Sequence, residues 1–170
     1  MDYLRNKAAL SRFIEGTISV TGSPKSDVIK TKHPKDTWDY FKSKGEPYYG
    51  DPMWGVFDFY VHPARSQYII DGGSIPVISR PFDCDDLSLW AMHATNGWES
   101  ELGVLLGEEI NKAHSICIFK EKDHITWTLD TSGLHRHSSR DDEYIVKYYS
   151  EVFSTNYLKL YRHGDPFVAF

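Results

Sequence analysis

Cysteine is scarce in this sequence, which has two cysteines in 170 residues. Two thiols cannot form the network of several disulfides that stabilises many small secreted domains. Long apolar segments are missing as well, because no run approaches the roughly 18 residues of a membrane-spanning helix. The first segment carries charges among its apolar positions, unlike a signal peptide. We therefore expect a cytoplasmic protein with reduced thiols and no membrane partner.

The sequence also lacks an excess of positive charge. It has 19 lysines and arginines against 24 aspartates and glutamates, which gives a net charge of −5 and a pI of about 5.9. Proteins that bind nucleic acid usually show the opposite balance, so we expect no nucleic-acid partner. Hydrophobic residues make up 41% and aromatic residues 15% of the chain, which is enough for a substantial core. The length fits one domain over residues 1–170 and leaves the oligomeric state open.

Hydrophobic spacing predicts the order of elements along the chain. Helices are expected over residues 2–15, 36–44 and 142–153, and a further helix is expected to begin at Cys84 and to stop at Gly97. Strands are expected over residues 102–106, 113–120, 124–130 and 157–162. Residues 48–80 are expected to be irregular, with 68–70 and 76–79 extended, and residues 132–142 are expected to form a loop. Helices followed by an antiparallel meander predict an α+β fold.

Cys84 is expected at the first position of its helix, after Asp83 as the N-cap. A thiolate there faces backbone N–H groups and the positive end of the helix dipole, which favour ionisation. Asp83, Asp85 and Asp86 oppose ionisation, because their charges disfavour another anion close by. An activated Cys84 therefore needs a neighbouring cation.

A histidine on the expected hairpin can be that cation. With the loop centred on Lys122, paired residues have numbers that sum to 244, as those of His114 and Asp130 do. The two side chains would then lie opposite each other on adjacent strands, with Cβ atoms about 4.5–5.5 Å apart. The aspartate would accept one imidazole N–H and leave the other nitrogen as a base. Cys84, His114 and Asp130 are therefore the predicted nucleophile, base and orienting acid.

The second cysteine has a different expected role. Cys117 shares one face of the hairpin with apolar side chains such as Phe119 and Trp127, which predicts a buried packing residue. The opposite face carries His114 among isoleucines and threonines. We expect this mixed face to lie under the helix of Cys84.

His135 and His137 leave a metal site as an alternative. Their His-x-His spacing occurs in zinc sites, and Cys84 or His114 could supply a further ligand. No Cys-x-x-Cys or His-Glu-x-x-His pattern accompanies them, so we prefer a solvated loop near the active site and expect no metal and no cofactor. A helix-start cysteine or a hairpin His–Asp pair is, taken singly, more often structural than catalytic. Their joint occurrence favours catalysis.

Three segments around these residues resemble the transglutaminase-like branch of the papain-like cysteine enzymes, in particular the small bacterial and phage-borne transglutaminase-like cysteine proteinases. The segments are DCDDLSLWA, AHSICIF and WTLDTSG. Members of this family carry a cysteine at an acidic helix start, a histidine that opens a strand and an aspartate that closes the next strand. Cys84, His114 and Asp130 fall on those positions, and Asp86 matches an acidic position after the nucleophile.

The resemblance implies a papain-like core over about residues 54–133, with the nucleophile's helix packed on an antiparallel sheet, and a helical extension over 1–50. It implies a cysteine hydrolase or acyltransferase that cleaves or exchanges an amide bond of a peptide, isopeptide or peptidoglycan stem through a thioester. The backbone N–H of Cys84 would form part of the oxyanion hole, with Gln67, Trp54 or Tyr60 as the second donor. The alternative is a catalytically inactive module that binds a protein or peptide in the same cleft.

Overall fold

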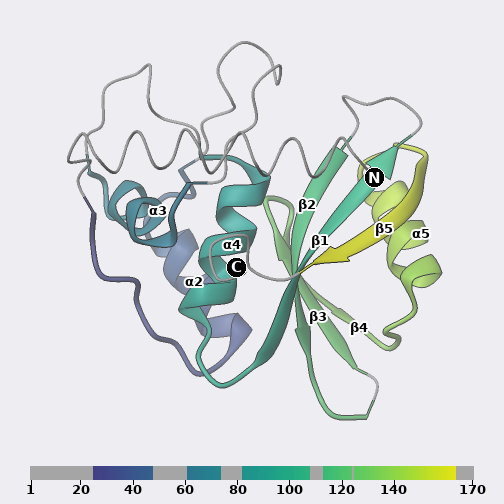
Figure 1. Cartoon of the computed structure of the whole chain (residues 1–170), viewed down its shortest axis with the longest axis horizontal. Coiled ribbons are helices and arrows are strands. Elements are labelled where there is room, and N and C mark those ends of the chain that lie inside the picture. The colour runs from purple at the N-terminus through teal and green to yellow at the C-terminus, as the bar shows by residue number, and fades with distance from the viewer. Residues whose placement is uncertain (1–24, 48–60, 74–81, 108–112, 124, 164–170) are drawn as a thin grey trace.

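The computed structural model describes residues 25–47, 61–73, 82–107, 113–123 and 125–163 (Figure 1). The helices in these ranges are α2 (Pro34–Ser43), α3 (Pro63–Ile70), α4 (Cys84–Ala94) and α5 (Asp142–Val152). The strands are β1 (Glu99–Gly107), β2 (Ala113–Lys120), β3 (Thr126–Asp130), β4 (Gly133–His137) and β5 (Tyr157–His163). The predicted α+β class is confirmed. The helix expected over residues 2–15 and the extended segment expected over 76–79 lie outside the described residues.

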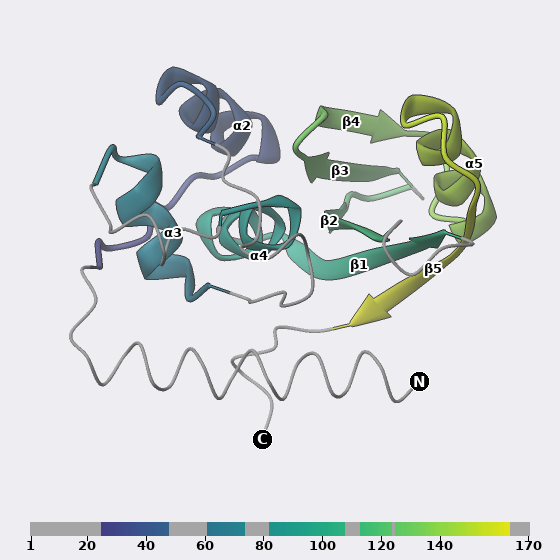
Figure 2. The same ribbon diagram turned by 90° about the horizontal axis from the view of Figure 1, so that it is seen from above.

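All five strands belong to one antiparallel sheet with the order β4-β3-β2-β1-β5. Helices α2, α3 and α4 lie on one side of this sheet and α5 lies on the other (Figure 2). Among the described strands, β4 and β5 are therefore the two edges, and β2 is the central strand. The residues predicted as base and orienting acid lie on β2 and β3, at the middle of this layered arrangement.

Two helices start where the sequence places a histidine before a proline. His33 caps α2 and His62 caps α3, each with a ring nitrogen that accepts a hydrogen bond from the backbone N–H two residues later. Proline suits the first helical position because the helix needs no N–H there. The expectation that residues 68–70 are extended is wrong, because they belong to the helix that begins with the His62 cap and Pro63.

The two faces of the sheet bury different sets of side chains. Cys117, Phe119 and Leu129 pack against α4 with residues such as Trp90, and Cys117 is fully buried as predicted. The other face packs against α5 through a second cluster: Leu105, Ile116, Ile118, Ile145, Tyr149, Tyr157 and Leu160. The expectation that the mixed face lies under the Cys84 helix is therefore wrong, because the apolar stripe of α4 requires the more apolar face of the hairpin.

The hairpin between β2 and β3 has a different register from the expected one. Paired residues have numbers that sum to 246, as those of Ile118 and Thr128 do. The turn lies one residue later in the chain, because Asp123 takes the left-handed conformation that a tight turn needs, with φ of 60°. A polar hairpin forms as predicted, but with its centre displaced.

This displacement moves His114 and Asp130 out of direct opposition, so that prediction is wrong. Continued along the strands, the observed register places Asp130 opposite Ile116, two residues from His114. A shift of two residues keeps every side chain on its original face, whereas a shift of one would reverse the faces. His114 and Asp130 are therefore diagonal neighbours, a separation that their side chains can bridge.

The segment after β3 forms a strand instead of the expected loop. Gly133–His137 pairs with β3 across a tight turn, with Asp130 opposite Gly133 and Thr126 opposite His137. Gly133 has φ of 145°, a value that residues with a side chain rarely adopt. The charged and polar composition of residues 132–142 concealed this edge strand, whose pairing depends on the β3 backbone and not on apolar alternation.

Candidate active site

Cys84 is the first residue of α4, as the sequence predicted. The Asp83 carboxylate accepts a hydrogen bond from Asp85 N–H at 3.3 Å, and Leu87 N–H donates to the Asp83 carbonyl at 3.0 Å. These contacts fix the first turn, and the thiol of Cys84 is half-buried. The helix therefore holds the sulfur at its N-terminal end, where the backbone dipoles favour negative charge.

One of the acidic residues beside Cys84, Asp85, is less anionic than the sequence suggested. Burial raises the pKa of Asp85 well above its usual value, and the charges of Asp83, Asp86 and Cys84 raise it further. Asp86 is fully buried and accepts a 2.6 Å hydrogen bond from Val61 N–H, which ties the start of α3 to α4. Since Asp85 holds its proton more strongly than an ordinary carboxyl, the repulsion that opposes a Cys84 thiolate is reduced.

His114 and Asp130 form a direct side-chain pair. His114 Nε2 lies 2.7 Å from Asp130 Oδ2, and the Asp130 side chain is fully buried. An ionised carboxylate only accepts hydrogen bonds, so Nε2 carries the proton and Nδ1 is the nitrogen left to act as a base. The geometry that the resemblance implies for a base and its orienting acid is present in this pair.

The Asp130 carboxylate is held in place by the turn that follows it. Its other oxygen, Oδ1, accepts hydrogen bonds from Ser132 N–H at 2.8 Å, from Ser132 Oγ at 2.7 Å and from Gly133 N–H at 3.1 Å. Three donors on one oxygen leave Oδ2 directed at His114. The turn between β3 and β4 therefore sets the orientation of the imidazole.

Cys84, the third predicted residue, also lies beside the start of β2. Ser115 N–H, the backbone group next to His114, points to Cys84 Sγ at 3.5 Å. Continued pairing of β2 with β3 would place position 131 opposite Ser115, one residue past the end of β3, so this N–H is available to the sulfur. The Cys84 side chain contacts this N–H from α4. The His114 side chain contacts Asp130 on the other side of β2.

Two aromatic residues that the sequence did not single out cover the histidine. Phe153, which follows α5, has its ring centroid 4.5 Å from that of His114, and the Tyr149 centroid lies at 6.1 Å. Tyr149 lies in α5, which packs on this face of the sheet, and Phe153 directly follows this helix. An aromatic cover excludes water from a hydrogen-bonded pair and strengthens it. Sequence spacing could not identify them, since they lie far along the chain from His114.

His135 and His137 belong to a hydrogen-bonded network under α5, so the solvated loop predicted for them is wrong. His135 Nδ1 lies 2.8 Å from the Tyr148 hydroxyl, and its Nε2 lies 3.0 Å from Ser132 Oγ. His137 is buried, with Nε2 2.7 Å from Thr128 Oγ1. These contacts engage both ring nitrogens of His135 and Nε2 of His137.

The His137 contacts make its stability contribution dependent on pH. Tyr149 donates to Thr128 Oγ1 at 2.7 Å, and the same oxygen lies 2.7 Å from His137 Nε2, so His137 belongs to a buried hydrogen-bond network. Burial and the nearby His135 lower the pKa of His137 to about 4. The unfolded chain, with a pKa near 6.5, therefore binds a proton that the folded chain rejects.

We expect the free energy of unfolding to fall as the pH drops from about 6.5 to about 4, by up to about 1.4 kcal/mol per pH unit from this residue. Urea denaturation of the wild type and of His137→Gln at several pH values measures the effect. The variant should be less stable at neutral pH and should show a weaker dependence on pH over this range. Parallel curves for the two proteins would contradict the assignment.

Gln67, one of the three expected oxyanion donors, is engaged elsewhere. Its Nε2 donates to the Tyr40 hydroxyl and to Asp71, both at 3.1 Å, which uses both amide hydrogens. Its Oε1 accepts from Trp90 Nε1 at 2.8 Å, so the residue fastens α3 to α4. The expectation for Gln67 is therefore wrong. Trp54 and Tyr60 lie outside the described residues.

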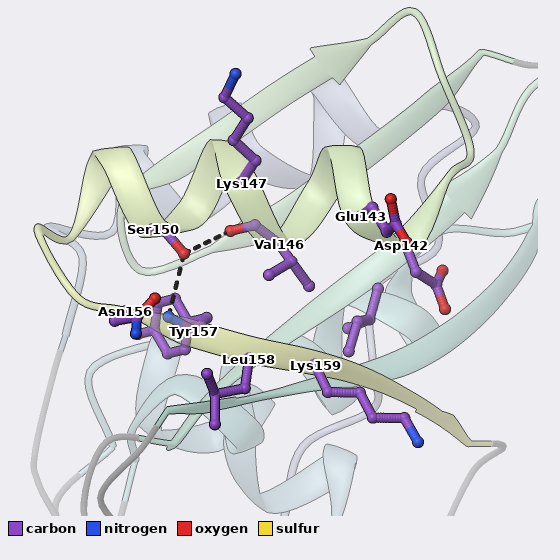
Figure 3. A pocket seen from close by; sticks show the side chains of 10 residues that line it. Asp142, Glu143, Val146, Lys147, Ser150, Asn156, Tyr157, Leu158 and Lys159 are labelled. Carbon is purple, nitrogen blue, oxygen red and sulfur yellow. Dashed lines mark hydrogen bonds between the residues drawn. The ribbon is translucent and has the colours of Figure 1, made fainter.

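Two further features of the molecule resemble ligand sites. Asp83, Cys84 and Asp85 place one ligand atom each within 4.8 Å of one another, which follows from their adjacency at the start of α4. A groove of about 620 Å³ runs between α5 and β5 (Figure 3). Cys84, His114 and Asp130 do not line this groove.

The described elements define an α+β protein built on a five-stranded antiparallel sheet. Comparisons of the chain with protein-family models, with curated proteins and with solved structures gave no match. In the part of the chain that the structure describes, no helix combines the length and the apolar character needed to cross a membrane. The function has to be inferred from the chain's own residues.

Proposed function

We propose that this protein is a cysteine hydrolase or acyltransferase of the transglutaminase-like type, with a papain-like core and a Cys84–His114–Asp130 triad. Its substrate is an amide bond of a peptide, an isopeptide or a peptidoglycan stem. The observation that carries the proposal is the 2.7 Å contact of His114 Nε2 with Asp130 Oδ2. Beside this pair, the sulfur of the helix-start Cys84 lies 3.5 Å from the backbone N of Ser115, the residue after His114 in β2.

Each residue has a definite part in the reaction. The Cys84 sulfur attacks the carbonyl carbon of the substrate, and His114 Nδ1 takes the thiol proton and then gives it to the leaving amine. Asp130 holds the imidazole in the tautomer that leaves Nδ1 available. The resulting thioester is resolved by water, or by an amine in a transamidation. The N–H of Cys84, in the first turn of α4, points past the helix end and stabilises the developing oxyanion.

The dependence of thiol alkylation on pH tests the proposal. We expect iodoacetamide to modify Cys84 with a half-maximal rate at least about two pH units below 8.5, because an ion pair with His114 stabilises the thiolate. Stopped-time labelling followed by mass spectrometry, at pH values from 4 to 9, measures it. A binding module without an activated thiol would show a midpoint near pH 8.5, which would contradict the proposal.

The second cysteine gives an internal control in the same experiment. Cys117 is fully buried, and burial together with the charge of Glu101 raises the pKa of its thiol well above the usual value. We therefore expect all labelling below pH 8 to map to Cys84 in peptides from the digested protein. His114→Gln should move the midpoint of Cys84 labelling towards pH 8.5.

A further inference from the structure

The proposed acyl transfer needs a second hydrogen-bond donor for the carbonyl oxygen, in addition to the N–H of Cys84. Gln67 has both amide hydrogens committed to Tyr40 and Asp71. Among the residues that the structure describes, a donor must therefore come from another element near Cys84 and His114. The start of β5, which the sequence pattern did not connect with the site, supplies a candidate.

A β-bulge re-aims the first side chain of β5. The strands pair regularly up to Leu106, but the next residue, Gly107, pairs with Tyr157, so Leu158 has no opposite residue. With regular pairing, Tyr157 would point away from the face that Leu160 occupies. The bulge places Tyr157 in the same core cluster as Leu160 and leaves Leu158 61% exposed. Bulges beside active sites commonly serve to re-aim a side chain in this way.

The re-aimed Tyr157 side chain lies on the same face as His114. The residue opposite Tyr157 is Gly107, which has no side chain to fill the space over β1. Two residues earlier on β1, Leu105 pairs with His114. Phe153 contacts both rings, with centroids 6.5 Å from Tyr157 and 4.5 Å from His114. The three aromatic rings therefore form a continuous group over this end of the sheet.

The backbone at Tyr157 is fixed to α5. Ser150 Oγ accepts a hydrogen bond from Tyr157 N–H at 3.1 Å and donates to the Val146 carbonyl at 2.8 Å (Figure 3). Tyr157 N–H also donates to the Thr155 carbonyl at 3.0 Å. The phenol is thus carried by an anchored backbone, which a donor needs if it is to be preorganised for a transition state.

The Tyr157 hydroxyl keeps its proton at neutral pH and can donate a hydrogen bond. Its side chain is 8% exposed, and burial is the largest cause that raises the pKa of Tyr157 to about 12. The negative charges of Cys84 and Asp130 raise it further. Both charges therefore act on the phenol through space.

We propose that the Tyr157 hydroxyl is the second oxyanion donor, which donates a hydrogen bond to the carbonyl oxygen of the acyl group that Cys84 attacks. This inference rests on the proposed function. As the carbon–sulfur bond forms, the carbonyl π electrons move to oxygen, and Tyr157 keeps its proton while it stabilises the charge. When the carbonyl re-forms, the bond to the leaving group breaks, and a leaving amine takes its proton from His114.

Tyr157→Phe tests the role, because it removes the hydroxyl and keeps the ring. With p-nitrophenyl acetate as the acyl probe, we expect the rate of Cys84 acylation to fall about 10²-fold. Alkylation of Cys84 by iodoacetamide forms no oxyanion, so its rate and its pH midpoint should stay as in the wild type. Tyr161→Phe, the same change on the same strand, should leave both rates unchanged.

Each other outcome overturns the inference. Equal acylation rates for wild type and Tyr157→Phe would show that the hydroxyl does not act on the carbonyl. An equal loss in acylation and alkylation would show that Tyr157 acts on the sulfur or on the fold. A wild type that reacts with the ester no faster than Cys84→Ala would overturn the proposed function as well, which distinguishes the two failures.

Discussion

Replacing Cys84 by alanine should reduce turnover of any acyl substrate by at least about 10⁴-fold, because it removes the atom that forms the thioester. The change is small in packing terms, since the thiol is half-buried at the first position of α4 and alanine is a good helix former. We therefore expect the variant to fold with nearly unchanged stability. Ester hydrolysis and denaturant unfolding of the same preparation measure both properties.

The other cysteine provides the matched control. Cys117→Ala removes a fully buried thiol from the core between the sheet and α4, so it should lower stability by about 1 kcal/mol and leave turnover within about twofold of the wild type. The two substitutions thus make opposite predictions for activity and for stability. Full activity of Cys84→Ala would exclude the proposed chemistry.

Asp130→Asn should lower kcat by about 10⁴-fold, the size of effect seen when a catalytic histidine is held in the wrong tautomer. The turn decides this outcome. Ser132 and Gly133 direct three donors at Oδ1, so the asparagine oxygen is held there and its NH₂ group faces His114. His114 Nε2 must then accept a hydrogen bond, which moves the ring proton to Nδ1 and removes the base.

The pH profile of the Asp130→Asn variant carries the distinctive signature. With Nδ1 protonated in the neutral ring, the fall in kcat should persist across the whole pH range instead of shifting along it. Asp123→Asn serves as the control, because asparagine tolerates the left-handed conformation of that exposed turn. Activity of Asp130→Asn near the wild-type level would show that the asparagine oxygen faces His114 and that the turn does not fix the carboxylate.

Local signals in the sequence were sufficient for much of the candidate site. The aspartate before Cys84 predicted both the helix start and the position of the thiol in it, and the structure has both. The limits of β2 were predicted to the residue. The strand contains the apolar run 116–119, and the polar residues after it mark its end. The assignment of Cys117 to the core followed from strand alternation alone.

The same reasoning failed where the outcome depended on backbone geometry or on distant partners. A one-residue displacement of the turn at Asp123 changed the β2–β3 register, and no propensity distinguished the two turns. The pairing of His114 with Asp130 survived because the displacement preserves side-chain faces. β4 was missed because a polar edge strand forms on a neighbour's unpaired backbone groups and carries no apolar alternation of its own.

The scarcity of cysteine, by itself, excluded a disulfide scaffold and left two thiols to be assigned. Periodicity and capping, which act over a few residues, determined the α+β class, the helix-start position of Cys84 and the burial of Cys117. Only the tertiary structure decided which helix covers His114, that Asp130 is held by its turn, and that a bulge turns Tyr157 towards the site. The helix cover and the bulge arise from contacts between segments far apart in the chain, whose energies depend on packing that no local pattern encodes. The contacts on Asp130 are local, but they depend on the turn geometry that forms when β4 pairs with β3.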